Sequence, residues 1–314
     1  MTAAAIDTLA VAKRYGAKTA LHDLTMTVGR GEVFGFLGPN GAGKTTAVKI
    51  FLGLVRPTSG ACEVLGKPLG DREARRKIGY LPELFRYQSW MTSAEVLDLH
   101  GELLGLPRAG RAKTVGDVLE LVGLQARAND RVGTYSKGMQ QRLGLGVALL
   151  GEPDLVFLDE PTSALDPVGR HDVRTIVESL KARGATVFLN SHLLTEVERV
   201  CDRVAVVDKG RVVASGSIDE MLGASTSVRL HLGSVNPDAL AILRAFGTLE
   251  IDAPWFVVGG ITDGSVPELV RRLVAAGVEI HAVEPSRTTL EERFLQLLKV
   301  PDAAVIDDRI PNPA

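Results

Sequence analysis

The chain has 314 residues, 45% of them hydrophobic and 24% charged, which is typical of a globular protein with two domains. Its 36 basic and 38 acidic residues give a net charge of -2, which disfavours a protein that binds nucleic acid through its overall charge. The two cysteines, Cys62 and Cys201, cannot form a disulfide framework, so a reducing cytoplasmic compartment is expected. The apolar stretches are far shorter than the ~18 residues of a membrane-spanning helix, and the N-terminus lacks the features of a signal peptide.

Apolar patterns predict a largely parallel sheet in the first two thirds of the chain. Strands are expected at 6–11, 24–28, 33–37, 155–158, 186–189, 204–207 and 211–214, the last two joined by a hairpin turn. A helix is predicted over 45–54, and residues 71–130 are expected to be mostly helical, with breaks at Pro82 and Pro107. Alternation of strands and helices predicts an α/β fold.

A second pattern begins after a boundary near residues 223–226. It predicts a strand at 228–232, a helix at 237–246, a strand pair within 249–258, a helix at 266–276, a strand at 278–283 and a helix at 290–298. This order predicts a small ferredoxin-like α+β domain. The expected domains are therefore 1–220 and 225–300, followed by a tail at 301–314 that is expected to be mobile because it has prolines and no periodicity.

A glycine-rich loop between the strand at 33–37 and the next helix is the strongest chemical signal. Its residues match the pattern G-x-x-x-x-G-K-T: Gly38, Pro39, Asn40, Gly41, Ala42, Gly43, Lys44 and Thr45, followed by Thr46. Backbone N–H groups of such a loop and the helix N-terminus bind phosphate oxygens. Lys44 would contact the β and γ phosphates, and the Thr45 hydroxyl would bind Mg²⁺. The alternative is a chance glycine-rich turn, which the flanking strand and helix disfavour.

Two acidic residues follow the predicted buried strand at 155–158. Asp159 lies at the carboxyl end of this strand, where open α/β sheets bind ligands, and would bind Mg²⁺ directly or through water. Glu160 points in another direction and would accept a proton from an attacking water. The alternative is an acidic strand end that caps the chain before Pro161, and the phosphate loop disfavours this alternative.

Ser136 and Gly138 open a predicted apolar helix and form a candidate anion receptor. On local features alone, an ordinary N-cap is the better interpretation of Ser136, since Met139 does not complete a capping box. The position of this segment upstream of Asp159 favours an anion-binding role only through the resemblance to a known family.

The ordered set of motifs from Ile6 to Gly216 resembles the ATPase subunit of an ABC transporter. The phosphate loop resembles Walker A, and Asp159 with Glu160 resembles the end of Walker B and its catalytic glutamate. Residues 135–139 resemble the signature motif, and residues 163–166 resemble the D-loop with Asp166. His192 resembles the switch histidine and Tyr15 the aromatic residue that stacks on adenine. Considered singly, His192 is an ordinary polar or core histidine and Tyr15 a packing residue.

The resemblance implies ATP and Mg²⁺ as cofactors and a catalytic set of Glu160, His192 and Lys44. It implies a helical subdomain at about 84–150 and a head-to-tail dimer, in which each ATP lies between the phosphate loop of one copy and Ser136 and Gly138 of the other. It further implies a separate integral-membrane permease subunit, and a peripheral position on the cytoplasmic face of the cell membrane. No nucleic-acid partner is expected.

Three residues depart from the usual family pattern. Glu83 stands where the family usually has the Q-loop glutamine, and Lys137 and Met139 replace a signature glycine and glutamine. These variants resemble the branch of multidrug, sodium and antibiotic exporters. A carboxylate at Glu83 would still bind Mg²⁺, or would be a solvated loop residue. An aromatic segment follows at 84–92, either docking a membrane partner or packing locally.

Export is the favoured function, and two alternatives stay open. An importer ATPase has the same motifs. A soluble ABC-type ATPase that acts on ribosomes or nucleic acid is disfavoured, because the chain has one cassette, no long heptad run and a near-neutral charge. An inactive relative is disfavoured because Lys44, Asp159, Glu160 and His192 are all present.

Overall fold

The computed structural model describes residues 4–163, 165–222, 226–287 and 289–299. The chain divides into two compact units, Met1–Ser217 and Ile218–Ala314. Within the described residues, no helix combines the length and the apolar character needed to cross a membrane. The expected boundary at 223–226 falls largely, and the expected tail at 301–314 entirely, outside the described residues.

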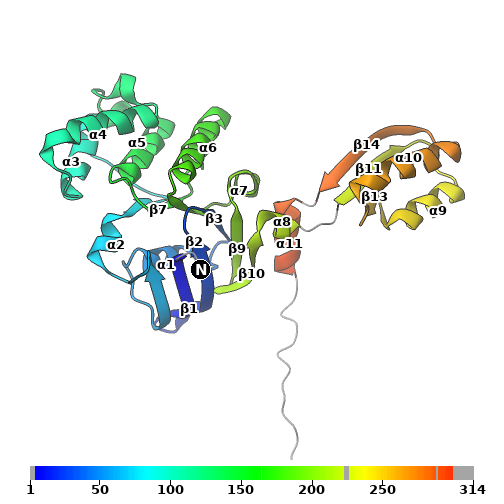
Figure 1. Cartoon of the computed structure of the whole chain (residues 1–314), viewed down its shortest axis with the longest axis horizontal. Coiled ribbons are helices and arrows are strands. Elements are labelled where there is room, and N and C mark those ends of the chain that lie inside the picture. Colours follow the sequence, from blue (N-terminus) through cyan, green and yellow to red (C-terminus); the bar gives the residue numbers. More distant parts are fainter. Residues whose placement is uncertain (1–3, 164, 223–225, 288, 300–314) are drawn as a thin grey trace, which may run out of the picture. The chain divides into compact units, whose positions relative to one another are not determined.

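The described strands of the first unit form one sheet in the order β5-β4-β1-β2-β10-β9-β3-β8-β7-β6. They are β1 Ala4–Tyr15, β2 Lys18–Gly29, β3 Val33–Leu37, β4 Ser59–Val64, β5 Lys67–Pro68, β6 Ile78–Leu81, β7 Leu155–Asp159, β8 Thr186–Asn190, β9 Arg203–Asp208 and β10 Arg211–Ser217. Figure 1 labels β1, β2, β3, β7, β9 and β10 of this sheet. Strands β6, β7, β8, β3 and β9 pair in parallel, while β1, β2, β4 and β5 form an antiparallel arm. The predicted α/β fold is confirmed.

Helices connect the parallel strands of this unit. They are α1 Lys44–Phe51, α2 Arg72–Arg76, α3 Ser93–Leu103, α4 Arg108–Leu121, α5 Lys137–Leu149, α6 Pro167–Ala182 and α7 Leu194–Val200, with 3-10 turns at Gln125–Arg127 and Val132–Thr134. Helices α3, α4 and α5 pack against one another as a helical subdomain. Helix α3 begins with a capping box, because Thr92 and Glu95 each bond the other's backbone N–H.

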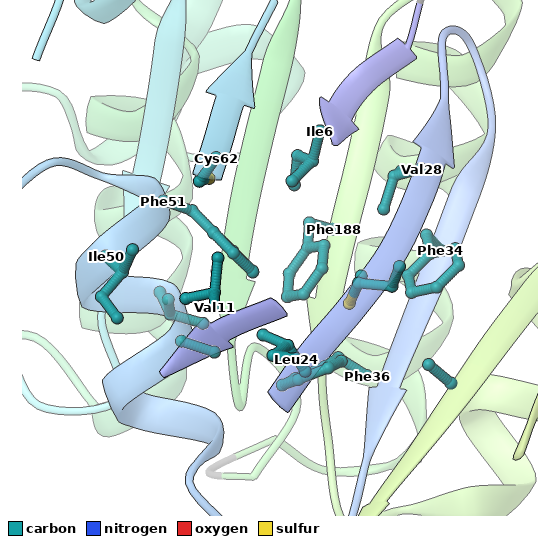
Figure 2. Packing of buried hydrophobic residues seen from close by; sticks show 14 of the residues in the cluster. Ile6, Val11, Leu24, Val28, Phe34, Phe36, Ile50, Phe51, Cys62 and Phe188 are labelled. Carbon is teal, nitrogen blue, oxygen red and sulfur yellow. The ribbon is translucent and has the colours of Figure 1, made fainter. Parts of the chain in front are cut away.

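The core of the first unit lies between the antiparallel arm, helix α1 and the parallel sheet. Phe51 of α1 meets Phe188 of β8 edge to face at 5.7 Å, and Phe157 of β7 lies 5.3 Å from Phe188. Figure 2 shows Phe51, Phe188, Phe34 and Cys62 as members of this cluster. Both cysteines are buried, and burial raises the pKa of Cys62 to about 12.

The second unit contains a four-stranded sheet. The elements of this unit are α8 Ile218–Leu222, β11 Thr226–Leu232, α9 Pro237–Phe246, β12 Thr248–Asp252, β13 Trp255–Gly259, a 3-10 turn at Asp263–Ser265, α10 Val266–Ala275, β14 Ile280–Arg287 and α11 Leu290–Lys299. Helices α9 and α10 pack on the sheet, and helices α8 and α11 contact each other. The order β12-β13-β11-β14 with antiparallel neighbours is the predicted ferredoxin-like arrangement. Alternate residues Val228 and Leu230 of β11 pack against Leu243 of α9 and Leu269 and Leu273 of α10.

The prediction of a mostly helical segment over 71–130 is wrong at β6, Ile78–Leu81. This strand has four residues and pairs with β7, so its hydrogen bonds come from a distant part of the chain. The helix predicted over 45–54 ends earlier, at Phe51, since Gly53 adopts the left-handed φ of 67° that ends helices. Strand β3 and helix α9 have the predicted bounds.

Candidate active site

The phosphate-loop sequence forms a tight loop between β3 and α1. Gly43 precedes α1 with φ 102°, a value that glycine adopts readily, and an added Cβ would lie 2.5 Å from the carbonyl oxygen of Ala20. Gly38 is equally confined, because a Cβ there would lie 2.2 Å from the carbonyl oxygen of Val207. The loop is anchored by the Gly210 N–H, which donates to the Ala42 carbonyl at 2.9 Å. Packing on β2 and on the β9–β10 hairpin therefore requires these glycines.

The ammonium group of Lys44 lies inside this loop. Its Nζ donates to the carbonyl oxygens of Gly38 at 2.6 Å and Pro39 at 3.2 Å. Burial lowers the pKa of Lys44, while the nearby carboxylates of Glu160, Asp159 and Glu83 oppose this shift. Thr45 and Thr46 continue into the first turn of α1, Thr45 being exposed and Thr46 half-buried. The structure thus brings Lys44 close to the three predicted acidic residues.

Asp159 lies at the carboxyl end of β7 and is buried. Its Oδ1 accepts a hydrogen bond from Nδ2 of Asn190, the last residue of β8, at 2.5 Å. Burial raises the pKa of Asp159, the Asn190 hydrogen bond lowers it, and the charges of Glu83 and Glu160 raise it further. Sequence reasoning gave no role to Asn190, because its pairing with Asp159 depends on the β7–β8 register, which the sequence does not display.

Glu160 turns away from the strand and meets the predicted switch histidine. Its Oε2 lies 2.7 Å from Nδ1 of His192, whose side chain is 64% exposed. His192 is therefore neither buried nor remote from the other predicted residues. A carboxylate at this distance orients an imidazole and sets which nitrogen carries its proton.

The acidic residues fit Mg²⁺ in one specific sense. Among the described residues, no group of three or more histidine, cysteine or acidic side chains could hold a metal by itself. Mg²⁺ commonly binds through one or two carboxylates together with substrate phosphates and waters. Asp159, the hydroxyl of Thr45 and Glu83 are the oxygen donors that could hold Mg²⁺ in this way.

Tyr15 lies at the end of β1, in the hairpin that continues into β2. It pairs with Lys18, two residues before Ala20, whose carbonyl oxygen faces Gly43. Tyr15 is 47% exposed, and Nζ of Lys13 lies 5.0 Å from the centroid of its ring. Its exposure disfavours a role in core packing.

Ser136 and Asp166 both cap helices. The Ser136 hydroxyl accepts a hydrogen bond from the Met139 N–H at 3.2 Å, at the N-terminus of α5. Oδ1 of Asp166 accepts a hydrogen bond from the Gly169 N–H at 2.8 Å, at the N-terminus of α6. An added Cβ at Gly138 would lie 3.3 Å from the Leu165 side chain, so the starts of α5 and α6 are neighbours. The local N-cap interpretation of Ser136 is confirmed, and it leaves the exposed start of α5 available to an anion.

In the aromatic segment at 84–92, some side chains pack locally and others are exposed. Phe85 and Tyr87 are half-buried and in contact, with ring centroids 5.4 Å apart, and Tyr87 also packs edge to face on His100. Leu84 and Trp90 are instead 87% and 70% exposed. Local packing therefore accounts for one pair, and an exposed apolar surface remains beside Glu83.

Comparisons with known proteins agree on one family. Residues 21–163 match the family model described as ABC transporter. An uncharacterized ABC transporter ATP-binding protein of Nostoc is 39% identical, over 91% of this chain and 85% of its own. The Nod factor export ATP-binding protein I of Rhizobium is 39% identical, over 77% and 81% of the two chains. A solved ATP-binding cassette, described as dimeric in a post-hydrolysis state bound to ADP and Pi, is 25% identical with a TM-score of 0.62, over 68% and 99%.

Proposed function

Because this chain belongs to the ABC transporter family of ATP-binding proteins, which are ATPases, we propose that it hydrolyses ATP to drive export through a separate membrane-spanning subunit. The observation that carries the proposal is the contact between Glu160 and His192, 2.7 Å apart, beside the buried Asp159 and the loop that encloses Lys44. This set contains an acid–base pair, a cation and a phosphate-binding loop in one place.

Each of these residues has a defined task in phosphoryl transfer. Loop N–H groups and Lys44 bind the phosphates and balance the charge that develops on the γ-phosphate. Glu160 accepts a proton from the attacking water, and His192, held by Glu160, orients that water and the γ-phosphate. Bound Mg²⁺ would supply further charge neutralisation, with Thr45, Asp159 and Glu83 as its protein-side oxygen donors. Tyr15 is about half-exposed and would stack on the adenine ring.

Two copies of the chain would share two ATP molecules. The phosphate loop and the start of α5 belong to different sites in this arrangement, so Ser136 and Gly138 of one copy would bind the phosphates held by Lys44 of the other. Asp166 would lie at the same contact, because the starts of α5 and α6 are neighbours. The dimeric relative bound to ADP and Pi supports this proposal.

Export and a peripheral position on the cytoplasmic face of the membrane rest on two observations. A relative that aligns over 81% of its own chain is named as an export protein. The exposed side chains of Leu84 and Trp90 lie in the segment after Glu83, where a membrane subunit would sense the state of the site. Cargo selection would belong to that subunit.

Replacing Glu160 by glutamine tests the proposal. The variant keeps size and hydrogen bonding but cannot accept a proton, so kcat should fall by about 10²–10⁴-fold while ATP binding is retained. Glu178→Gln, an exposed carboxylate on α6, is the matched control and should hydrolyse ATP like the wild type. Unchanged turnover in Glu160→Gln would remove Glu160 from the role of base. A wild-type protein that neither binds nor hydrolyses Mg²⁺-ATP would overturn the function itself.

A further inference from the structure

Asn190 contacts both acidic residues of the active site. Its side-chain Nδ2 donates to Oδ1 of Asp159 at 2.5 Å, and its backbone carbonyl oxygen accepts from the Glu160 N–H at 2.8 Å. In the sheet, Asn190 lies between Asp159 of β7 and Phe36 of β3. Phe36 is two residues before Gly38, where the phosphate loop begins. It is 4% exposed, so both contacts are shielded from solvent.

The side-chain amide of Asn190 is a neutral hydrogen-bond donor to a buried carboxylate. A buried carboxylate needs a donor, and an amide nitrogen provides one without adding a charge that would compete with a cation. The nitrogen must face Asp159, because the amide oxygen in its place would repel the carboxylate. Replacing the asparagine by an apolar residue of similar size would leave Asp159 free to rotate and its Oδ1 unpaired.

The other end of the same amide, Oδ1, is buried and has no hydrogen-bond partner in the part of the chain that the structure describes. Buried side-chain oxygens nearly always accept at least one hydrogen bond from protein or water. An amide that is bonded at one end and unpaired at the other, at the ligand end of a parallel sheet, indicates a donor that arrives with the ligand.

We propose that Asn190 is a positioning residue of the ATPase site, which orients the Asp159 carboxylate and accepts, at Oδ1, a hydrogen bond from a water that arrives with Mg²⁺. Outer-shell partners of this kind fix the orientation of metal-binding carboxylates. The inference rests on the proposed ATPase function. It adds that Asn190 acts through the metal and leaves the binding of the nucleotide itself to the phosphate loop.

A metal-dependent binding experiment isolates this role. ATP affinity is measured by calorimetry with Mg²⁺ and with EDTA, in the full chain carrying Glu160→Gln so that ATP is not consumed. Asn190→Leu removes both polar atoms with little change in size. Thr186→Val is the matched control, because Thr186 is also buried on β8 and its hydroxyl accepts from the Gly31 N–H at the far end of the strand.

Asn190→Leu should reduce the gain in ATP affinity caused by Mg²⁺ by about 10–100-fold. Its affinity in EDTA should stay within about twofold of the parent protein, since Lys44 and the loop are unchanged. In a background that also carries Asp159→Asn, adding Asn190→Leu should cause almost no further loss, because two residues that act as one unit are not additive. Thr186→Val should keep the full effect of Mg²⁺.

Three results would overturn the inference. In the first, Mg²⁺ raises the ATP affinity of Asn190→Leu as much as that of the parent protein. In the second, Asn190→Leu loses the same ATP affinity in Mg²⁺ and in EDTA, and in the third, Thr186→Val loses as much of the Mg²⁺ effect as Asn190→Leu does. If Asn190→Leu does not fold, as judged by thermal melting, Asn190→Ser is measured against the same criteria. If the parent protein binds ATP with a normal Mg²⁺ gain and Asn190→Leu matches it, the proposed function stands and this inference fails. A parent protein that binds no ATP overturns both.

Discussion

At the scale of single residues, two carboxylates that are adjacent in sequence have different partners. Asp159 is the last residue of β7, and its carboxylate accepts a hydrogen bond from Asn190. Glu160 has φ 52°, an uncommon value for a residue with a side chain, and this conformation turns its carboxylate toward His192. The Ser163 hydroxyl and N–H both donate to the Glu160 carbonyl, which stabilises the turn. Local backbone geometry therefore gives the two adjacent carboxylates different partners, Asn190 for Asp159 and His192 for Glu160.

Glu83 carries a charge that acts on its neighbours without a direct hydrogen bond among the described contacts. The residue is exposed, yet its carboxylate raises the pKa of Asp159 and opposes the lowering of the pKa of Lys44. Charge interactions at exposed positions are worth about 1 kcal/mol or less, which is about fivefold in affinity. Glutamine keeps a side-chain oxygen that can bind Mg²⁺ and loses only the charge, so Glu83→Gln should change the dissociation constant of Mg²⁺-ATP by no more than this factor.

The measurement is Mg²⁺-ATP binding by calorimetry in the Glu160→Gln background. Glu120→Gln, an exposed carboxylate on α4, is the control and should bind like the parent. If Glu83→Gln abolishes the binding instead, the carboxylate is an indispensable ligand of the metal and the electrostatic account is wrong.

At the scale of elements, the phosphate loop depends on where its glycines have room. Gly43 and Gly41 both have positive φ, 102° and 85°. A Cβ at Gly43 would meet the Ala20 carbonyl at 2.5 Å and the Leu21 side chain at 2.7 Å, whereas a Cβ at Gly41 would meet no atom within 4 Å. The two positions share backbone strain and differ in crowding.

Alanine substitutions at these glycines should consequently differ in severity. Gly41→Ala should lower the free energy of unfolding by about 1–2 kcal/mol, the cost of a left-handed conformation with a side chain. Gly43→Ala adds a clash with β2 worth about 1–3 kcal/mol more, and should also weaken ATP binding by displacing the loop. Urea unfolding and ATP titration of the two variants test this order. Equal effects would mean that the loop relaxes away from β2 at little cost.

Elements with a strong local signal could be predicted from the sequence, and elements that depend on distant partners could not. The continuous apolar run of β3 and the periodicity of α9 each define their own bounds. Strand β6 escaped prediction because four residues carry no distinct periodicity and its bonds come from β7. The site follows the same rule. Motifs predicted Lys44 and Asp159 as site residues, whereas the Asn190–Asp159 hydrogen bond depends on the β7–β8 register, which the sequence does not display.

At the scale of the whole molecule, each unit has a core of its own. The first is centred on the phenylalanine cluster around α1, and the second on the helix-facing side of β11 and β13. The predicted site residues from Tyr15 to His192 all belong to the first unit. The nucleotide chemistry that we propose therefore requires residues of this unit and, at the start of α5, those of a second copy.

ATP should accordingly join two copies of the chain. Glu160→Gln with Mg²⁺-ATP should have twice the monomer mass in light scattering, and Lys44→Ala should stay monomeric because it lacks the phosphate-binding cation. Ser136→Asp separates capping from ATP contact: aspartate is as good an N-cap as serine, so α5 keeps its stability, but its charge would face the phosphates of the other copy. This variant, combined with Glu160→Gln, should melt like the parent, bind ATP and fail to dimerise. Dimerisation of Ser136→Asp at the parent's ATP concentration would place Ser136 away from the shared nucleotide.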